Sequence, residues 1–173
     1  MSITAHDFKQ RFAALLDKFE HDQAEVLLNT LTRTNASVGE VLYRCGEHSD
    51  VFHLVWEGRV SLSIAVNAKD ITLGTIGPGQ FIGALSVIDP GPAPVTFNVI
   101  AQSVLLRLDH AGLNALRDEH PEVGSLLLRT LSHDLAHWLR TYEEYLMKRT
   151  RSESVEEFVH LGMHLLGIKE LPE

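Results

Sequence analysis

The chain has 173 residues and a formal net charge of −8 at pH 7, with 45% hydrophobic and 22% charged residues. This length is enough to bury a substantial core, and no apolar run approaches the ~20 residues of a transmembrane helix. The acidic balance argues against a free-standing nucleic-acid binder, which usually presents a basic face. The N-terminus lacks the basic-then-apolar order of a secretory signal, and a lone cysteine favours a reducing cytoplasm over an oxidising compartment. No contact with a membrane is expected.

Residues 1–36 are predicted to form an N-terminal helical segment. Apolar residues recur at three- and four-residue steps from Phe8 to Phe19, which marks one face of a helix. His21 and Asp22 interrupt this pattern, and a second short helix is expected up to Leu31. Two short helices make a poor core by themselves, so we expect them to pack on the rest of the chain.

Residues 37–109 are predicted to form a small β-barrel. Strand-like segments occur at 40–44, 50–66, 71–76, 96–101 and 104–108. Glu57 and Gly58 are expected to break the second segment into two strands, and the polar residues 67–70 are expected to form a hairpin turn. Six to eight short strands punctuated by Gly and Pro are typical of a barrel or jelly roll.

Residues 110–173 are expected to be helical up to about Leu166, and Pro121 is well placed to begin a long helix. Apolar side chains spaced by three and four residues form a coiled-coil-like seam along it. The seam consists of Leu128, Leu131, Leu135, Trp138, Tyr142 and Tyr145. We expect a homodimer through this seam, because Leu127, Leu139 and Leu146 let the helix bury a second face. The alternative is a helix that lies only on its own barrel. A final helix is expected from Ser154 to Gly167.

The order of helix, barrel, cradle-like loop, strand and long helix resembles the cyclic nucleotide-binding domain of the catabolite activator and FNR superfamily. The likeness is carried by "YRCGEHSDVFHLVWEGRVSLSI", with Gly46, Asp50 and Gly58, and by "GQFIGALSVI", with Phe81, Gly83 and Leu85. It covers about Phe8 to Leu166. The resemblance implies an α+β, mainly β fold: a double-stranded β-helix or jelly-roll barrel with N-terminal helices and a long C-terminal dimerisation helix.

The resemblance also implies a phosphate cassette, in which ligand-binding members use a Glu for the ribose hydroxyl and an Arg for the cyclic phosphate. The Glu position is Ala84 here, and the Arg position is Val95, or Pro94 in a register one residue different. No basic residue lies between Lys69 and Arg107. Losing both groups should weaken cyclic nucleotide binding by roughly 3 kcal/mol or more, which is over about a hundredfold. We expect the following pocket residues to keep the shape of the cradle without its phosphate chemistry: Phe81, Ile82, Gly83, Ala84, Leu85, Pro94, Val95 and Thr96.

Four of the histidines form two pairs with helical spacing, His133 with His137 and His160 with His164. Each pair would share one helix face and offer two metal ligands, but no further ligand with metal-site spacing accompanies them. The favoured interpretation is polar surface, and no metal or cofactor is predicted. Haem ligation by His48, His53 or a helix histidine stays open, because the family includes haem sensors. Cys45 is expected to be a buried free thiol.

No nucleophile elbow, phosphate-binding loop or metal triad is present in the sequence, so no enzymatic activity is predicted. The predicted function is a stand-alone regulatory or sensor module, degenerate for cAMP and cGMP, that acts through a homodimer and an unidentified protein partner. The alternatives are a receptor for another small ligand (a nucleotide, haem or an apolar metabolite) and a transcription regulator without its own DNA-reading module. The transcription-factor relatives continue into a helix-turn-helix, whereas the sequence ends at Glu173, so no specific DNA binding is expected.

Overall fold

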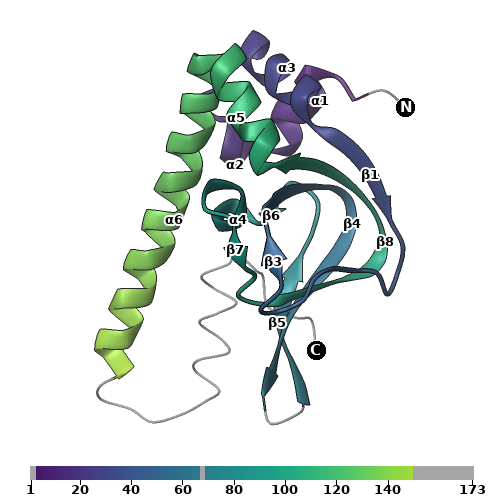
Figure 1. Cartoon of the computed structure of the whole chain (residues 1–173), viewed down its shortest axis with the longest axis vertical. Coiled ribbons are helices and arrows are strands. Elements are labelled where there is room, and N and C mark those ends of the chain that lie inside the picture. Colours follow the sequence, from purple (N-terminus) through teal and green to yellow (C-terminus); the bar gives the residue numbers. More distant parts are fainter. Residues whose placement is uncertain (1–2, 67–68, 150–173) are drawn as a thin grey trace.

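The computed structural model describes residues 3–66 and 69–149 of the chain. A curved antiparallel sheet occupies one side of the molecule, short helices cover its upper end, and a long helix runs down beside it (Figure 1). The helices are α1 (Ala5–Arg11), α2 (Ala13–Leu16), α3 (His21–Thr30), α4 (Ala84–Ile88), α5 (His110–Glu119) and α6 (Pro121–Arg149). Pro121 begins the long helix as predicted.

The sheet has the mainly β, jelly-roll character that was expected. Its strands are β1 (Thr32–Ala36), β2 (Val41–Tyr43), β3 (His48–Ser49), β4 (Val51–Val66), β5 (Lys69–Ile76), β6 (Phe81–Ile82), β7 (Gly91–Pro92) and β8 (Thr96–Asp109). The main sheet runs β1-β8-β4-β5, with β2 also paired to β8 and β6 to β4, while β3 and β7 pair separately. The sheet already begins at Thr32, before position 37, because β1 pairs with the far end of β8.

The interruption expected at Glu57 and Gly58 is wrong, because β4 continues through both residues. The register of β4 against β8 shifts around Glu57 and Arg59, which places a bulge there. Gly58 has a φ of +92°, and a Cβ on it would overlap Ser103 of the facing strand. A bulge with glycine at a close approach lets the strand bend and continue. The two strands expected at 96–101 and 104–108 are likewise a single strand, β8. The predicted hairpin is confirmed, since β4 and β5 pair up to Val66 and Lys69.

The N-terminal helices lie on the sheet as expected, although the first is split into two. Phe12 has φ −108° and ψ 40°, which ends α1 and separates it from α2. His21 and Asp22 begin α3 instead of lying in a gap. The predicted apolar face is buried against the rest of the domain, with every member at most 2% exposed: Phe8, Phe12, Leu15, Leu16 and Phe19.

Two hydrophobic clusters hold the domain together, one on each face of the curved sheet. The outer cluster joins the helices to β4 and β8, for example through Phe52 and Leu106. The inner cluster fills the barrel and includes Val55, Leu105 and Phe97. Successive strand residues point to opposite faces, and both faces are covered at residues 51–55 of β4 and 104–108 of β8, which explains the largely apolar sequence of these two segments.

The upper part of α6 belongs to this core, which corrects part of the predicted seam. Leu131, like Leu127, is fully buried in the outer cluster, and Leu128 packs against that cluster. These side chains contact their own domain, because α6 packs on α5, α4 and α3. Farther along, Leu135 is half-buried, whereas Trp138 and Leu139 are 38% and 51% exposed. Tyr142, Tyr145 and Leu146 belong to α6, but their side chains are not among those that the structure describes.

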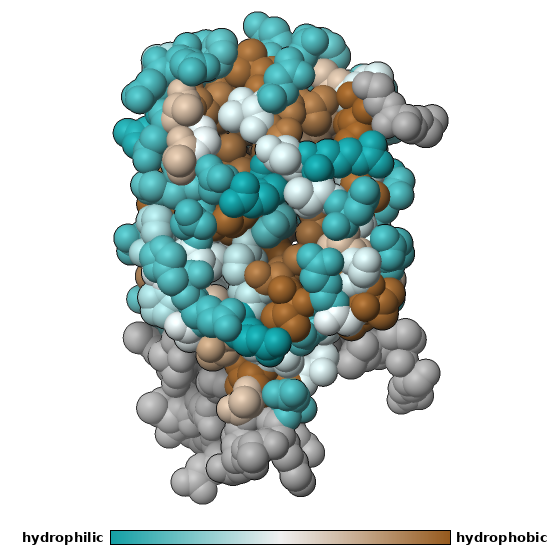
Figure 2. Space-filling view, turned by 45° about the vertical axis from the view of Figure 1, so that its right-hand side comes forward, coloured by the Kyte–Doolittle hydropathy of each residue, from teal (hydrophilic) through white to brown (hydrophobic). Residues whose placement is uncertain are grey.

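The surface is mixed in character. On the face shown in Figure 2, brown apolar patches are interrupted by hydrophilic side chains. Large apolar side chains that are exposed include Val38, Leu85 and Ile100. Within the described ranges, no helix combines the length and apolar character needed to cross a membrane. The helix expected from Ser154 to Gly167, with His160 and His164, lies outside the described residues.

Candidate functional site

The cassette segment is a tight turn followed by a very short helix. Gly83 adopts a left-handed conformation (φ +82°) at the start of α4 and lies directly against the Val51 carbonyl of β4. Phe81, half-buried on β6, packs on Phe52 with ring centroids 5.3 Å apart. Ile82 pairs with His53 and faces the inner cluster. The backbone of the cradle is therefore fixed by β4.

The proline-rich loop after α4 is tied to the turn at residues 44–47. Gly46 N–H donates to the Ala93 carbonyl at 2.8 Å, and Cys45 N–H donates to Thr96 Oγ1 at 3.0 Å. The Cys45 thiol also lies 3.4 Å from the Pro94 carbonyl. Cys45 is exposed, so the expectation of a buried thiol is wrong. The reason is that the turn, with Gly46 at φ +84°, holds this residue at the surface.

The two positions aligned with the Glu and the Arg of the phosphate cassette belong to different hydrophobic clusters. Ala84 is 8% exposed and packs in the outer cluster with the helices. Val95 is half-buried and packs against the inner cluster of the barrel, whereas Pro94 is exposed. Leu85, on α4, is 52% exposed. At these positions the cassette offers apolar surface and no charged side chain.

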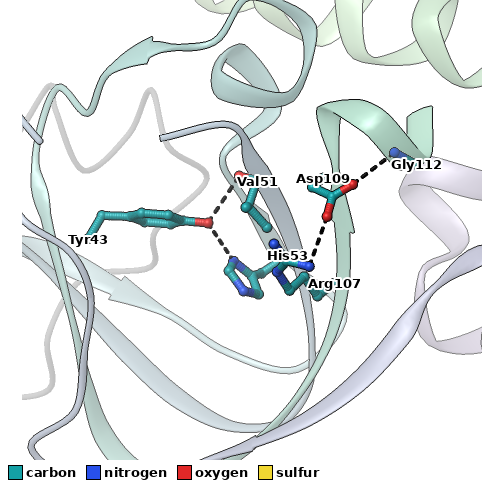
Figure 3. Close-up of polar contacts among 6 residues, drawn as sticks. All are labelled: Tyr43, Val51, His53, Arg107, Asp109 and Gly112. Atoms are coloured by element: carbon teal, nitrogen blue, oxygen red, sulfur yellow. Dashed lines mark hydrogen bonds and ion pairs between the residues drawn. The ribbon is translucent and has the colours of Figure 1, made fainter. Parts of the chain in front are cut away.

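A second polar constellation lies inside one end of the barrel (Figure 3). Tyr43, from β2, reaches across to β4, where its hydroxyl donates to the Val51 carbonyl at 3.1 Å. The same hydroxyl is 2.8 Å from Nδ1 of His53. Since the phenol has one proton and gives it to Val51, the imidazole donates from Nδ1 to the phenol oxygen. In a neutral imidazole this assignment leaves Nε2 as the unprotonated nitrogen.

Burial sets the protonation states of this pair. Burial, with a smaller contribution from the positive charge of Arg107, lowers the pKa of His53 from 6.5 to about 4. Burial also raises the pKa of Tyr43 above its ordinary value. Both groups are therefore uncharged near neutral pH, and their hydrogen bond joins two neutral partners.

Arg107 connects this pair to the start of α5. Arg107 is the cross-strand partner of His53 between β8 and β4. Its Nη1 donates to Asp109 Oδ2 at 3.0 Å, and Oδ1 of the same carboxylate accepts from Gly112 N–H at 2.8 Å. Asp109 thus caps α5. The Gly112 N–H, and to a lesser extent Arg107, lower the pKa of Asp109.

The remaining histidines do not gather into a metal site among the described residues, where no group of three or more potential ligands occurs. His133 is exposed and lies 3.9 Å from an Asp134 oxygen, and His137 is exposed one turn later. His48, on β3, is exposed as well. Among the candidate histidines within residues 3–66 and 69–149, His53 is the one enclosed by the barrel.

Sequence reasoning considered His53 only as a haem ligand and did not single out Tyr43 or Arg107. A signal was available in the two long strands. His53 lies between apolar residues in the run 51–55, and Arg107 in the run 104–108, so each of these two runs is interrupted by one polar group. Tyr43 could not be found in this way, because β2 has only three residues and shows no comparable pattern. The folded barrel is what brings Tyr43 next to His53.

The model of the cyclic nucleotide-binding domain family matches residues 33–120. Lysophospholipase nte1 of Aspergillus fumigatus is 30% identical over 124 residues, which are 69% of this chain and 8% of that protein. A CRP-like cAMP-activated global transcriptional regulator of Mycobacterium tuberculosis is 25% identical over 124 residues, 71% of this chain and 55% of the regulator. This chain thus spans less than two thirds of either relative.

Solved structures agree on the fold. A cyclic nucleotide-binding domain from Methylobacillus flagellatus superposes with a TM-score of 0.72 at 20% identity, covering 87% of this chain and 88% of that domain. The matched residues 33–120 contain β2 to β8 and α5, so they include the cassette and the Tyr43–His53 pair. The chain belongs to the cyclic nucleotide-binding domain family.

Proposed function

We propose that this chain is a regulatory module whose cyclic nucleotide cassette has lost its ligand chemistry, and that it acts as a homodimer on a protein partner. The observation that carries the proposal is the absence of a charged side chain at Ala84, Pro94 and Val95. A cyclic phosphate needs a counter-charge, because burying an anion without one is costly. The relationship to a transcriptional regulator supports a role in regulation.

Packing supports the same proposal. Val95 contacts the inner cluster, so its side chain contributes to the barrel core and offers no hydrogen bond. Tyr43, which packs edge-on against Phe97 at 5.8 Å between centroids, occupies part of the barrel interior. These side chains stabilise the barrel without a ligand.

Calorimetry with cAMP and cGMP at neutral pH tests the loss of ligand chemistry. We expect no binding in the micromolar range, whereas the cAMP-activated regulator from M. tuberculosis, measured in the same buffer, provides the positive control. A dissociation constant for either nucleotide in the low micromolar range or below would refute the degenerate cassette.

The proposed dimer uses the outer half of α6. Leu139 is 51% exposed and Leu135 half-buried, one turn apart on this helix. A second copy related by a two-fold axis would cover them with the same residues, as in an isologous interface.

Light scattering at micromolar concentration checks the assembly. We expect a dimer for the wild type and a monomer for Leu139→Glu, which places like charges at the interface; a monomeric wild type would disprove the dimer.

A further inference from the structure

A pocket of about 270 Å³ opens at the end of the barrel where β1 and β2 face β4 and β8. Its lining combines polar side chains, among them Tyr43, His53 and Arg107, with apolar ones, among them Val41, Leu42 and Leu105. None of its lining residues comes from the cassette segment 79–101. The pocket is therefore separate from the cyclic nucleotide cradle, and it does not depend on the function proposed above.

Arg107 provides the positive charge of this pocket. Its ion pair with Asp109 uses Nη1, and the described contacts assign no acceptor to Nε or Nη2. The side chain is 37% exposed, so these donors are accessible from the pocket. A guanidinium with one edge held by a carboxylate and the other open is suited to a second carboxylate.

The Tyr43–His53 pair forms a fixed, neutral wall beside this cation. His53 is 7% exposed, and its Nδ1 and the Tyr43 hydroxyl are held together at 2.8 Å. No hydrogen bond is described for Nε2 of His53, which leaves this atom to accept from a ligand or water. Because the pair carries no charge, Arg107 alone determines the attraction for an anion at this wall.

The charges around the pocket limit the ligand to one negative charge. Among the described lining residues Arg107 is the only cation, and Glu40 lines the same pocket. Asp109 already neutralises part of the guanidinium charge. A dianion such as a phosphate monoester would meet two carboxylates and one shared cation, which is unfavourable. A monocarboxylate needs only the open edge of Arg107.

We propose that this pocket binds a small monocarboxylate with an apolar body, with the carboxylate on the open edge of Arg107 and the body against Val41, Leu42 and Leu105. Ligand sites commonly combine an apolar lining with a few placed polar groups in this way. The pocket is small, so the ligand is a metabolite of a few carbon atoms or one ring.

Nuclear magnetic resonance of the full chain with benzoate as the probe tests the proposal. We expect benzoate to shift the ring signals of Tyr43 and His53 in a saturable manner. The neutral benzyl alcohol and the dianion phenyl phosphate should bind at least about tenfold more weakly, because an ionic hydrogen bond is lost or opposed. If phenyl phosphate saturates the shifts at a lower concentration than benzoate, the proposal of a monocarboxylate ligand is overturned.

Two variants and a matched control complete the test. Arg107→Gln should abolish the benzoate-dependent shifts, whereas Arg59→Gln, an exposed arginine of β4 that does not line the pocket, should leave them unchanged. If Arg107→Gln does not fold, Leu42→Trp, which fills the pocket and keeps the cation, should remove binding. Unchanged binding in a folded Arg107→Gln, or no saturable shift in the wild type, would overturn the proposal.

Discussion

The α-carbon of Gly83 lies so close to the carbonyl oxygen of Val51 that a Cβ at this position would overlap that oxygen. The contact joins the cassette turn to β4 at the strand residue whose carbonyl also accepts from Tyr43. The atom that a side chain would meet is part of a paired strand, so it cannot move aside cheaply. The left-handed conformation of Gly83 adds a second reason for glycine here.

Replacing Gly83 with alanine should therefore destabilise the domain more than the left-handed conformation alone explains. Gly39→Ala is the matched control, because Gly39 has a similar φ of +87° and no atom lies within 4 Å of the place that its added methyl group would occupy. We expect about 1 kcal/mol for Gly39→Ala and clearly more for Gly83→Ala, measured by urea unfolding. Equal losses would show that the turn relaxes away from Val51 without cost.

The two faces of α6 should respond differently to truncation. Leu131 is fully buried in the outer cluster and Leu139 is 51% exposed. Leu131→Ala should lower the free energy of unfolding by roughly 2–5 kcal/mol, the range for a buried leucine. Leu139→Ala should change the stability of the single domain by less than about 1 kcal/mol.

Chemical denaturation measures both effects without a contribution from the proposed dimer. Leu131→Ala is introduced into the Leu139→Glu protein, in which the dimer is removed, and is compared with the single Leu139→Glu variant. Leu139→Ala is compared with the wild type over a series of protein concentrations, and the difference is taken at the lowest concentration, where a dimer dissociates. A small effect at Leu131 would contradict its place in the core.

The helical faces and the barrel were predictable from sequence because their signals are local. The spacing of Phe8, Phe12 and Phe19 follows from a helix that buries one side, and the structure buries all three. The continuity of β4 was not predictable, since Glu57 and Gly58 look like a turn until β8 supplies the partner that accommodates a bulge. The partner of the apolar seam on α6 was not predictable either. Three-and-four spacing fits a helix packed on its own domain as well as one packed on a second copy, and Leu131 packs on its own domain.

The cap of α5 gives a prediction that separates a helix cap from a surface ion pair. Asp109 caps the helix by accepting from Gly112 N–H, and it forms an ion pair with Arg107. Asp109→Ala should cost about 1 kcal/mol, in the range for a lost N-cap. Asp109→Asn keeps an oxygen acceptor for Gly112 and loses only the partly exposed ion pair, so it should cost a few tenths of that. Thermal unfolding of the two variants at neutral pH measures the difference; equal losses in the two variants would assign the stability to the ion pair, which both of them lack.

His53 should make the stability of the domain depend on pH below neutrality. Its pKa is lowered from 6.5 in the unfolded chain to about 4 in the folded domain, first by burial and then by Arg107. Between these values the unfolded chain binds a proton that the folded domain does not, so stability falls as the pH decreases from about 6.5 to about 4 and the loss stops below that. A shift of this size corresponds to roughly 3 kcal/mol.

His53→Gln tests this assignment, because glutamine keeps a polar side chain of similar length and does not titrate. Urea unfolding of the wild type and the variant at a series of pH values from about 7 to 4 gives the two stability curves, and their difference isolates His53 from the carboxylates. We expect the wild type to lose roughly 3 kcal/mol more than His53→Gln over this interval. Parallel curves would mean that the imidazole titrates alike in both states, and therefore that it is not enclosed beside Tyr43 and Arg107.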